Sequence, residues 1–192
     1  ERLIDIDYDE ESKKVLSFDS IEEKESYVDG LYNANTRKTN FVEISYKSNY
    51  DSKFFFQDVR LLDGTDFKDS VDILIGGSPC QSFSRAMRTE MRVGLADKER
   101  SGLFLECYRI LKEVKPTYFM MENVVMKKED EEVISKMLGV NPIRINSSLI
   151  TAQMRDRLYW TNIPDVTVPE SKNVKVSDII NDGYYPYDKA RC

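Results

Sequence analysis

The chain has 192 residues, among them 28 basic residues, 34 acidic residues, three cysteines and no histidine. This length fits one domain or the larger lobe of a two-lobed enzyme. The absence of histidine excludes Ser-His and Cys-His catalytic pairs and the usual zinc sites. Hydrophobic residues make up 41% of the chain, enough for a core, and no apolar stretch has the length of a membrane span. We therefore expect a soluble globular protein whose catalysis, if any, comes from Cys, Asp, Glu, Lys, Arg or a cofactor.

The net charge of −6 is unevenly distributed along the chain. Residues 1–30 carry eleven acidic and four basic side chains, so the remainder of the chain sums to +1. Between positions 85 and 100 lies a group of five basic residues, Arg85, Arg88, Arg92, Lys98 and Arg100. A solvated surface loop is the ordinary explanation for such a group. Its position just after Cys80, a candidate nucleophile, favours phosphate binding instead.

The three cysteines lie far apart, at positions 80, 107 and 192, and show no C-x-x-C spacing. This pattern favours a reducing compartment. The chain begins with Glu1 and shows neither a leader peptide nor a stop-transfer pattern, so we expect a fragment without a targeting segment.

Segments 14–16, 41–44 and 54–59 are strand-like in the N-terminal half of the chain. Segment 71–77 is short, rich in β-branched residues and closed by glycines, which predicts a buried strand of a parallel sheet. Segment 118–125 predicts a second such strand.

Between these two strands, residues 102–115 show helical spacing up to Pro116, which predicts a β-α-β unit. We further expect a helix over 129–138 that stops at Gly139, and strands over 143–146 and 157–162. Alternation of this kind predicts a doubly wound α/β sheet with its ligands beyond the carboxyl ends of the strands.

Cys80 follows the first buried strand, in the sequence Gly-Gly-Ser-Pro-Cys-Gln-Ser-Phe-Ser. A cysteine on a tight turn at a strand end is held out of the core, where its thiolate can reach a ligand. Cys107, in contrast, lies on the apolar face of the helix over 102–115, where a cysteine acts as a small buried hydrophobic residue.

Glu122 interrupts an apolar strand close to its carboxyl end. Such a residue either has a functional partner or bonds the local backbone, and the sequence leaves both possibilities open. Arg155 and Arg157 are two residues apart on an extended segment, so both side chains can reach one polar substrate. A surface pair sharing Asp156 is the alternative.

Taken together, these segments resemble the cytosine-C5 DNA methyltransferase family, closest to the branch of phage and prophage enzymes and animal de novo methyltransferases. The matching motifs are Pro79-Cys80-Gln81, Glu122-Asn123-Val124, the Gln-x-Arg-x-Arg of Gln153, Arg155 and Arg157, and Arg100 to Phe104.

The resemblance implies an incomplete Rossmann-like sheet of the S-adenosylmethionine-dependent methyltransferases, acting by base flipping on double-stranded DNA. It also implies that Cys80 adds to C6 of the flipped cytosine and that Glu122 holds N3 and supplies a proton. Arg157 would bond O2, with Arg155 beside it, and C5 would take the methyl group. Further substrate contacts fall on Gln81, Ser82, Ser84, Asn123, Val124 and Gln153. A microbial or phage-encoded cytoplasmic enzyme of a restriction-modification type is implied, with methylation of tRNA or a catalytically silent subunit as alternatives.

The cofactor motifs are less complete. Segment 14–21 contains Phe18 and Asp19 but none of the glycines usual in the first motif. Glu43 is similar to the acid that binds the ribose, although Asp5 is a rival, and Asp58 and Val59 are similar to the pair that holds the adenine. The cofactor set is Phe18, Asp19, Glu43, Asp58, Val59, Pro79 and Leu103.

The resemblance divides the chain into a catalytic lobe over 1–165 and a linker over 166–192. The linker would lead towards a target-recognition domain. We expect that domain and motifs IX and X on a second chain or a missing segment.

Overall fold

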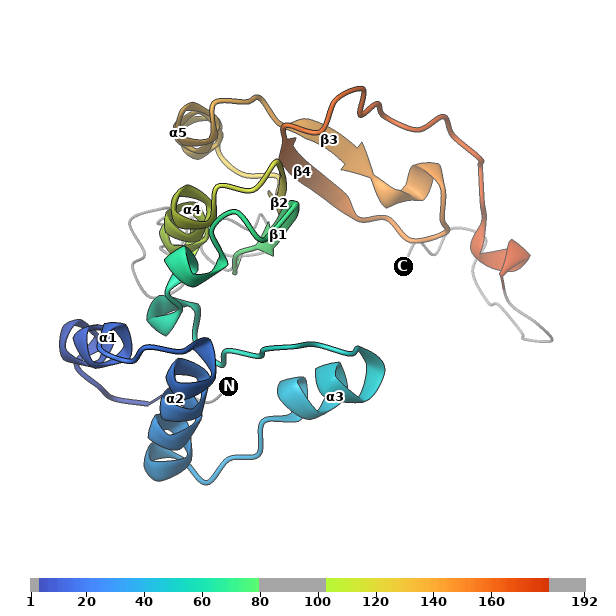
Figure 1. Cartoon of the computed structure of the whole chain (residues 1–192). Coiled ribbons are helices and arrows are strands. Elements are labelled where there is room, and N and C mark those ends of the chain that lie inside the picture. Colours follow the sequence, from blue (N-terminus) through green and yellow to red (C-terminus); the bar gives the residue numbers. More distant parts are fainter. Residues whose placement is uncertain (1–3, 80–102, 180–192) are drawn as a thin grey trace.

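A computed structural model describes residues 4–79 and 103–179 of the chain (Figure 1). These residues form a four-stranded sheet in the order β1-β2-β4-β3. Its strands are β1 (Ile73–Gly77), β2 (Tyr118–Val124), β3 (Ile143–Asn146) and β4 (Asp156–Thr161). Strands β1 and β2 are parallel, whereas β4 pairs antiparallel with β2 and with β3. All four strands lie where the sequence predicts them, which confirms the α/β class, but β1 is not the buried strand that the sequence predicts.

Two helices accompany the sheet at the predicted positions. Helix α4 (Leu103–Val114) precedes β2, and helix α5 (Lys128–Leu138) connects β2 to β3. Gly139 ends α5 in the left-handed conformation, with φ of 73°, and its N–H donates to the carbonyl of Ser135. Glycine adopts this conformation without strain, so it is a favourable stop signal.

Both helices pack on the same face of the sheet (Figure 1). The core there is built from alternating residues of β2 and β4 together with side chains of the two helices, namely Phe104, Phe119, Met121, Ile134, Leu158 and Trp160. Trp160 is fully buried and donates its ring N–H to Ser135 Oγ of α5 at 2.9 Å. This hydrogen bond satisfies the polar atom of the largest core side chain.

The opposite face of the sheet is uncovered in the described part of the chain. Ile73 and Ile75 of β1 are 45% and 61% exposed, and Tyr118 of β2 is 40% exposed. Parallel strands are ordinarily covered on both faces. Glu122 shares this open face, because side chains alternate along a strand and Glu122 is four residues from Tyr118.

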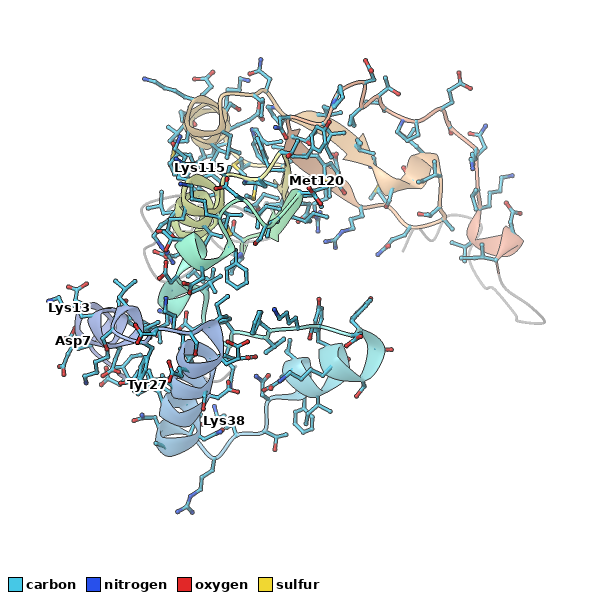
Figure 2. All side chains as sticks on the ribbon, in the orientation of Figure 1. Asp7, Lys13, Tyr27, Lys38, Lys115 and Met120 are labelled. Atoms are coloured by element: carbon cyan, nitrogen blue, oxygen red, sulfur yellow. The ribbon has the colours of Figure 1, made fainter. Side chains whose placement is uncertain are left out.

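The N-terminal part of the chain is helical, with α1 (Tyr8–Leu16), α2 (Ile21–Asn35) and α3 (Phe41–Asn49). Asp7, labelled in Figure 2, caps α1. Its side chain accepts hydrogen bonds from the N–H groups of Asp9 and Glu10. Ser20 and Glu23 form a capping box at the start of α2. A second core cluster joins α1 and α2 to the 3-10 helix η1 (Val59–Leu61) through Val15, Val28, Tyr32 and Leu61.

Three strand predictions in this region are wrong. Residues 14–16 end helix α1, where Val15 is buried and Lys14 pairs with Glu10 and Glu11 of the same helix. Residues 41–44 begin helix α3, because Asn40 caps it by accepting from the N–H of Glu43. Short apolar runs do not distinguish strands from helices by pattern alone, and in both cases the cap and the ion pairs favour the helix.

Residues 54–59 form no strand either. They are irregular and lead into η1, since the carboxylate of Asp58 accepts from the N–H of Arg60 and turns the chain. Phe54 and Phe55 pack instead against Phe67 and Tyr46.

Helix α4 fastens the sheet to the N-terminal helices. Arg109 donates to the carbonyls of Val59 and Leu62, and Glu113 accepts from the N–H of Gly64. Lys24 of α2 is buried and pairs with Asp63 and Asp66 at 2.8 Å. Within the described ranges, no helix is both long and apolar enough to cross a membrane. After β4 the chain is irregular up to the short 3-10 helix η6 (Val176–Asp178).

Candidate active site at the ends of strands β1 and β2

The carboxyl ends of β1 and β2 lie side by side. Gly77 is the register partner of Glu122, and a Cβ atom built on Gly77 would lie 3.5 Å from Glu122 Oε2. The chain leaves β1 at this point towards Ser78 and Pro79. This edge is where the sequence predicts the site.

Glu122 is held by two arginines from the segment that enters β4. Arg157 Nε lies 2.7 Å from Glu122 Oε1, and Arg155 Nη2 lies 3.4 Å from the same oxygen. The side chain of Arg157 is 18% exposed, that of Arg155 is 50% exposed and that of Glu122 is 27% exposed. Both arginines therefore point the same way, as expected from their spacing.

Asp156, between the two arginines, accepts from Arg144 of β3, with Arg144 Nε 2.9 Å from Asp156 Oδ1, and its backbone carbonyl accepts from Arg157 Nη1 at 2.9 Å. The guanidinium groups of Arg155 and Arg157 both pair with Oε1 of Glu122. The Oε2 atom lies on the side of Gly77.

Asn123 fastens the end of β2 to the segment after β1. Its side chain is buried, donates from Nδ2 to Ser78 Oγ at 3.0 Å and accepts from the N–H of Val124 at 2.8 Å. Ser78 is two residues before Cys80 in the sequence. The predicted residues Cys80, Gln81, Ser82 and Ser84, and the basic group over 85–100, lie outside the described residues.

The family comparison shows which family the chain belongs to. A model of the C-5 cytosine-specific DNA methylase family matches residues 23–140, which include Glu122 and Asn123. The chain belongs to the C-5 cytosine-specific DNA methylase family. Its four strands are part of the Rossmann-like sheet of these enzymes.

Several curated members of the family are similar to the chain. The Type II methyltransferase M.Bsp6I of Bacillus sp. (strain RFL6) is 28% identical over 174 residues, covering 78% of this chain and 54% of the relative. M1.ScrFI of Lactococcus lactis subsp. cremoris is 34% identical over 126 residues, covering 60% and 31%. The orphan methyltransferase M.SPRI of Bacillus phage SPR is 32% identical over 149 residues, covering 70% and 33%. The chain spans about half the length, or less, of these relatives.

Two other residues of the methylase motifs contribute to the site, Gln153 through its backbone carbonyl and Val124 through packing. The carbonyl of Gln153 accepts from Ser147 Oγ at 2.9 Å, which shapes the loop before Arg155. Val124 is buried in the core cluster. Asn146 was not expected at this loop, yet its Oδ1 accepts from the N–H groups of Ser148 and Arg155. The signal for it is an asparagine at a strand end followed by two serines, which is typical of an Asx turn.

Cys107 has the structural role expected from its position. It packs against the core cluster on α4, and burial raises the pKa of its thiol, so the thiolate is disfavoured. A Cβ atom on Gly76 would lie 2.7 Å from Met121 Sδ and 3.8 Å from Cys107 Sγ, which explains the glycine at this close approach.

Members of this methylase family use S-adenosylmethionine as methyl donor, and the residues predicted to bind it lie on separate elements. Phe18 follows α1 and contacts the ring of Tyr27, with the centroids 5.1 Å apart. Asp19, Asp5 and Pro79 are exposed, Val59 begins η1, and Leu103 begins α4.

The two acids assigned to the cofactor are already bonded within the protein. Glu43 lies on α3, where its Oε1 accepts from Lys47 and its Oε2 from Asn40. Asp58 is buried among Arg60, Tyr32 and Tyr8. In this arrangement Glu43 and Asp58 do not fit the cofactor-binding roles that the resemblance implies. No group of three or more potential metal ligands occurs among the described residues.

Proposed function

We propose that the protein is a DNA (cytosine-5) methyltransferase that methylates C5 of a flipped cytosine, with Cys80 as nucleophile. The observation that carries this proposal is the carboxylate of Glu122 at the joined ends of β1 and β2, held by Arg155 and Arg157. Membership of the methylase family supports the reaction class. The methyl donor of the family is S-adenosylmethionine, for which this chain does not present a complete site in its described residues.

The reaction requires a nucleophile and a proton donor from the chain. The Cys80 thiolate forms a bond to C6 of the cytosine ring while N3 takes a proton from Glu122, so that C5 becomes nucleophilic. When C5 has accepted the methyl group, loss of the C5 proton, departure of the thiolate and return of the N3 proton to Glu122 restore the ring. Extrusion of the base costs a few kcal/mol, roughly, which contacts in the pocket offset.

The contacts of Glu122 and Asn123 support the roles proposed for these residues. Both arginines engage Glu122 Oε1, so Oε2 faces the Gly77 side, where the segment towards Cys80 leaves the sheet. In this proposal Arg157 positions the Glu122 side chain and bonds the O2 atom of the base. Asn123 and Ser78 fix the start of the segment that bears Cys80. The further substrate contacts expected at Gln81, Ser82, Ser84, Val124 and Gln153 belong to the same proposal.

Double-stranded DNA is the proposed substrate partner.

The open face of the sheet is where a companion polypeptide would fit. Ile73, Ile75 and Tyr118 leave apolar surface exposed on that face. The curated relatives are longer than this chain. We propose a catalytic lobe over 1–165, with 166–192 leading to a target-recognition domain on another segment or chain.

Exchange of the C5 proton tests the nucleophile without any methyl donor. Addition of a thiolate at C6 makes C5 able to take up a solvent proton, so duplex DNA tritiated at cytosine C5 should release tritium to water. We expect release by the wild-type chain and by Cys107→Ser, and no release by Cys80→Ser. Release that survives Cys80→Ser would rule out Cys80 as nucleophile.

A catalytically silent subunit is the second candidate, favoured by the dispersed cofactor residues. The same exchange measurement separates it, because a silent subunit releases no tritium from any substrate. Tritiated tRNA in a parallel reaction separates DNA from RNA as the substrate class.

A further inference from the structure

Asp58 is the most heavily hydrogen-bonded carboxylate among the described residues. It caps η1 and is only 6% exposed. Its Oδ1 accepts from the N–H and from Nε of Arg60, at 3.0 and 2.9 Å. Its Oδ2 accepts from Arg60 Nη2 at 2.8 Å, Tyr32 OH at 2.6 Å and Tyr8 OH at 3.1 Å.

These five hydrogen bonds use the whole accepting capacity of the group. An ionised carboxylate offers about four lone-pair sites on its two oxygens. A further donor, such as the exocyclic amino group of adenine, would have to displace Arg60 or one of the tyrosines. Displacement would leave a buried charge or hydroxyl without its partner, which is costly.

The donors come from three different elements. Tyr8 begins α1, Tyr32 lies on α2 and Arg60 lies on η1. Arg60 also stacks its guanidinium 3.9 Å above the ring of Tyr8. We call these four residues, Asp58, Arg60, Tyr8 and Tyr32, the Asp58 cluster.

The surroundings of the Asp58 cluster are those of a core. Tyr32 is buried, and Val15, Val28 and Leu61 pack in the same cluster of buried side chains. Burial alone would raise the pKa of Asp58, but the hydrogen bonds from Arg60 and Tyr32 lower it below its ordinary value. The carboxylate is therefore charged, paired and enclosed at neutral pH.

We propose that Asp58 is a structural residue that fastens α1 and α2 to η1, and that any S-adenosylmethionine bound by this protein makes no contact with its carboxylate. The chain thus departs from the family resemblance, which assigns this residue to the adenine. The proposal is independent of the role given to Cys80.

Asp58→Asn and Tyr32→Phe test the proposal as a pair. Both weaken the Asp58 cluster, but only the first changes the group that would bind adenine. Asp19→Asn is the control, because Asp19 is exposed and was assigned to the same cofactor. Thermal unfolding and calorimetric titration with S-adenosylmethionine are measured on all three variants and the wild type, the titration at a temperature where each is folded.

We expect both cluster variants to lower Tm by several degrees, and Asp19→Asn to leave it unchanged. Affinity for S-adenosylmethionine should be the same in Asp58→Asn and Tyr32→Phe, or be absent from all four proteins. A tenfold or greater loss of affinity in Asp58→Asn alone would overturn the proposal, as would unchanged Tm values in both cluster variants. If Asp58→Asn does not fold, the proposal is tested by the Tm of Tyr32→Phe and its affinity for S-adenosylmethionine, each compared with the wild type. The tritium exchange reaction needs no methyl donor. A failure of the proposed function can therefore be distinguished from a failure of the proposal for Asp58.

Discussion

Arg157 Nε lies 2.7 Å from Glu122 Oε1, across the antiparallel pair of β2 and β4. Arg155 reaches the same oxygen from 3.4 Å with a side chain that is half exposed. A contact that is short and shielded positions a group better than one that is long and hydrated. The two arginines are therefore unequal, although their motif spacing makes them look equivalent.

Substitution of the two arginines should reveal this difference. We expect Arg157→Ala to slow release of the C5 tritium by about 100-fold, the order of loss that a misplaced catalytic group causes. Arg155→Ala should slow it less than about tenfold, because its contact with Glu122 is long and exposed.

Arg144→Ala is the matched control for this pair. It removes an arginine that pairs with Asp156 on the neighbouring strand, whereas Glu122 pairs with Arg155 and Arg157. Equal losses in the rate of tritium release for Arg155→Ala and Arg157→Ala would contradict the unequal roles of the two arginines.

The local features of the site could be predicted from the sequence because each depends on near neighbours. The side chains of Arg155 and Arg157 share a direction because strand side chains alternate, and that fact needs no tertiary contact. Glu122 stands out in the strand over 118–125 because it interrupts an apolar run. Gly139 likewise marks the end of α5 through its own backbone preference.

The Asp58 cluster could not be predicted in the same way. Tyr8 and Asp58 are 50 positions apart, and their contact exists only because α1 packs beside η1. The misassigned segment 41–44 shows a related limit. Its four residues are too few to display a period, so the cap at Asn40 determines the helix.

Asn123 and Ser78 should be energetically coupled. Asn123→Ala removes a buried side chain and two hydrogen bonds, so we expect a loss of about 1–3 kcal/mol in the free energy of unfolding. Ser78→Ala removes one of these bonds and should cost about 1 kcal/mol. The double variant should cost less than the sum, because both single changes remove the same bond. Urea denaturation measures all three, and strict additivity would show that the bond contributes nothing.

The two glycines that end β1 form a matched pair for a packing test. A Cβ at position 76 meets Met121 Sδ at 2.7 Å, whereas one at position 77 has only an ordinary contact with Glu122 at 3.5 Å. Gly76→Ala should therefore lower the free energy of unfolding by about 1–3 kcal/mol through overpacking. Gly77→Ala should change it far less. The same urea series measures both, and a larger cost at position 77 would show that Met121 yields more readily than Glu122.

At low pH the Asp58 cluster should lose its contribution to stability. The pKa of Asp58 is lowered in the folded state from an ordinary value of 3.8, so folding favours the charged form. This stabilisation is present above the ordinary pKa and is lost as the pH falls through the folded pKa. The difference in Tm between the wild type and Asp58→Asn should accordingly shrink below about pH 4. A difference that stays constant down to pH 2, roughly, would contradict the lowered pKa.

At high pH the effect of the same cluster has the opposite sign. Burial, followed by the charge of Asp58, raises the pKa of Tyr8 from 10.0 to about 12. Folding therefore favours the neutral phenol, and the stabilisation is complete below the unfolded pKa of 10.0 and is lost as the pH rises to about 12. Tyr8→Phe carries no ionisable group, so its Tm should fall less steeply over this window than that of the wild type. Tyrosines and lysines outside the Asp58 cluster contribute alike to both curves, so the difference reports the ionisation of Tyr8 together with its coupling to Tyr32. Parallel curves would mean that Tyr8 ionises as readily in the folded protein as in the unfolded chain, and that its hydrogen bond to Asp58 does not persist in solution.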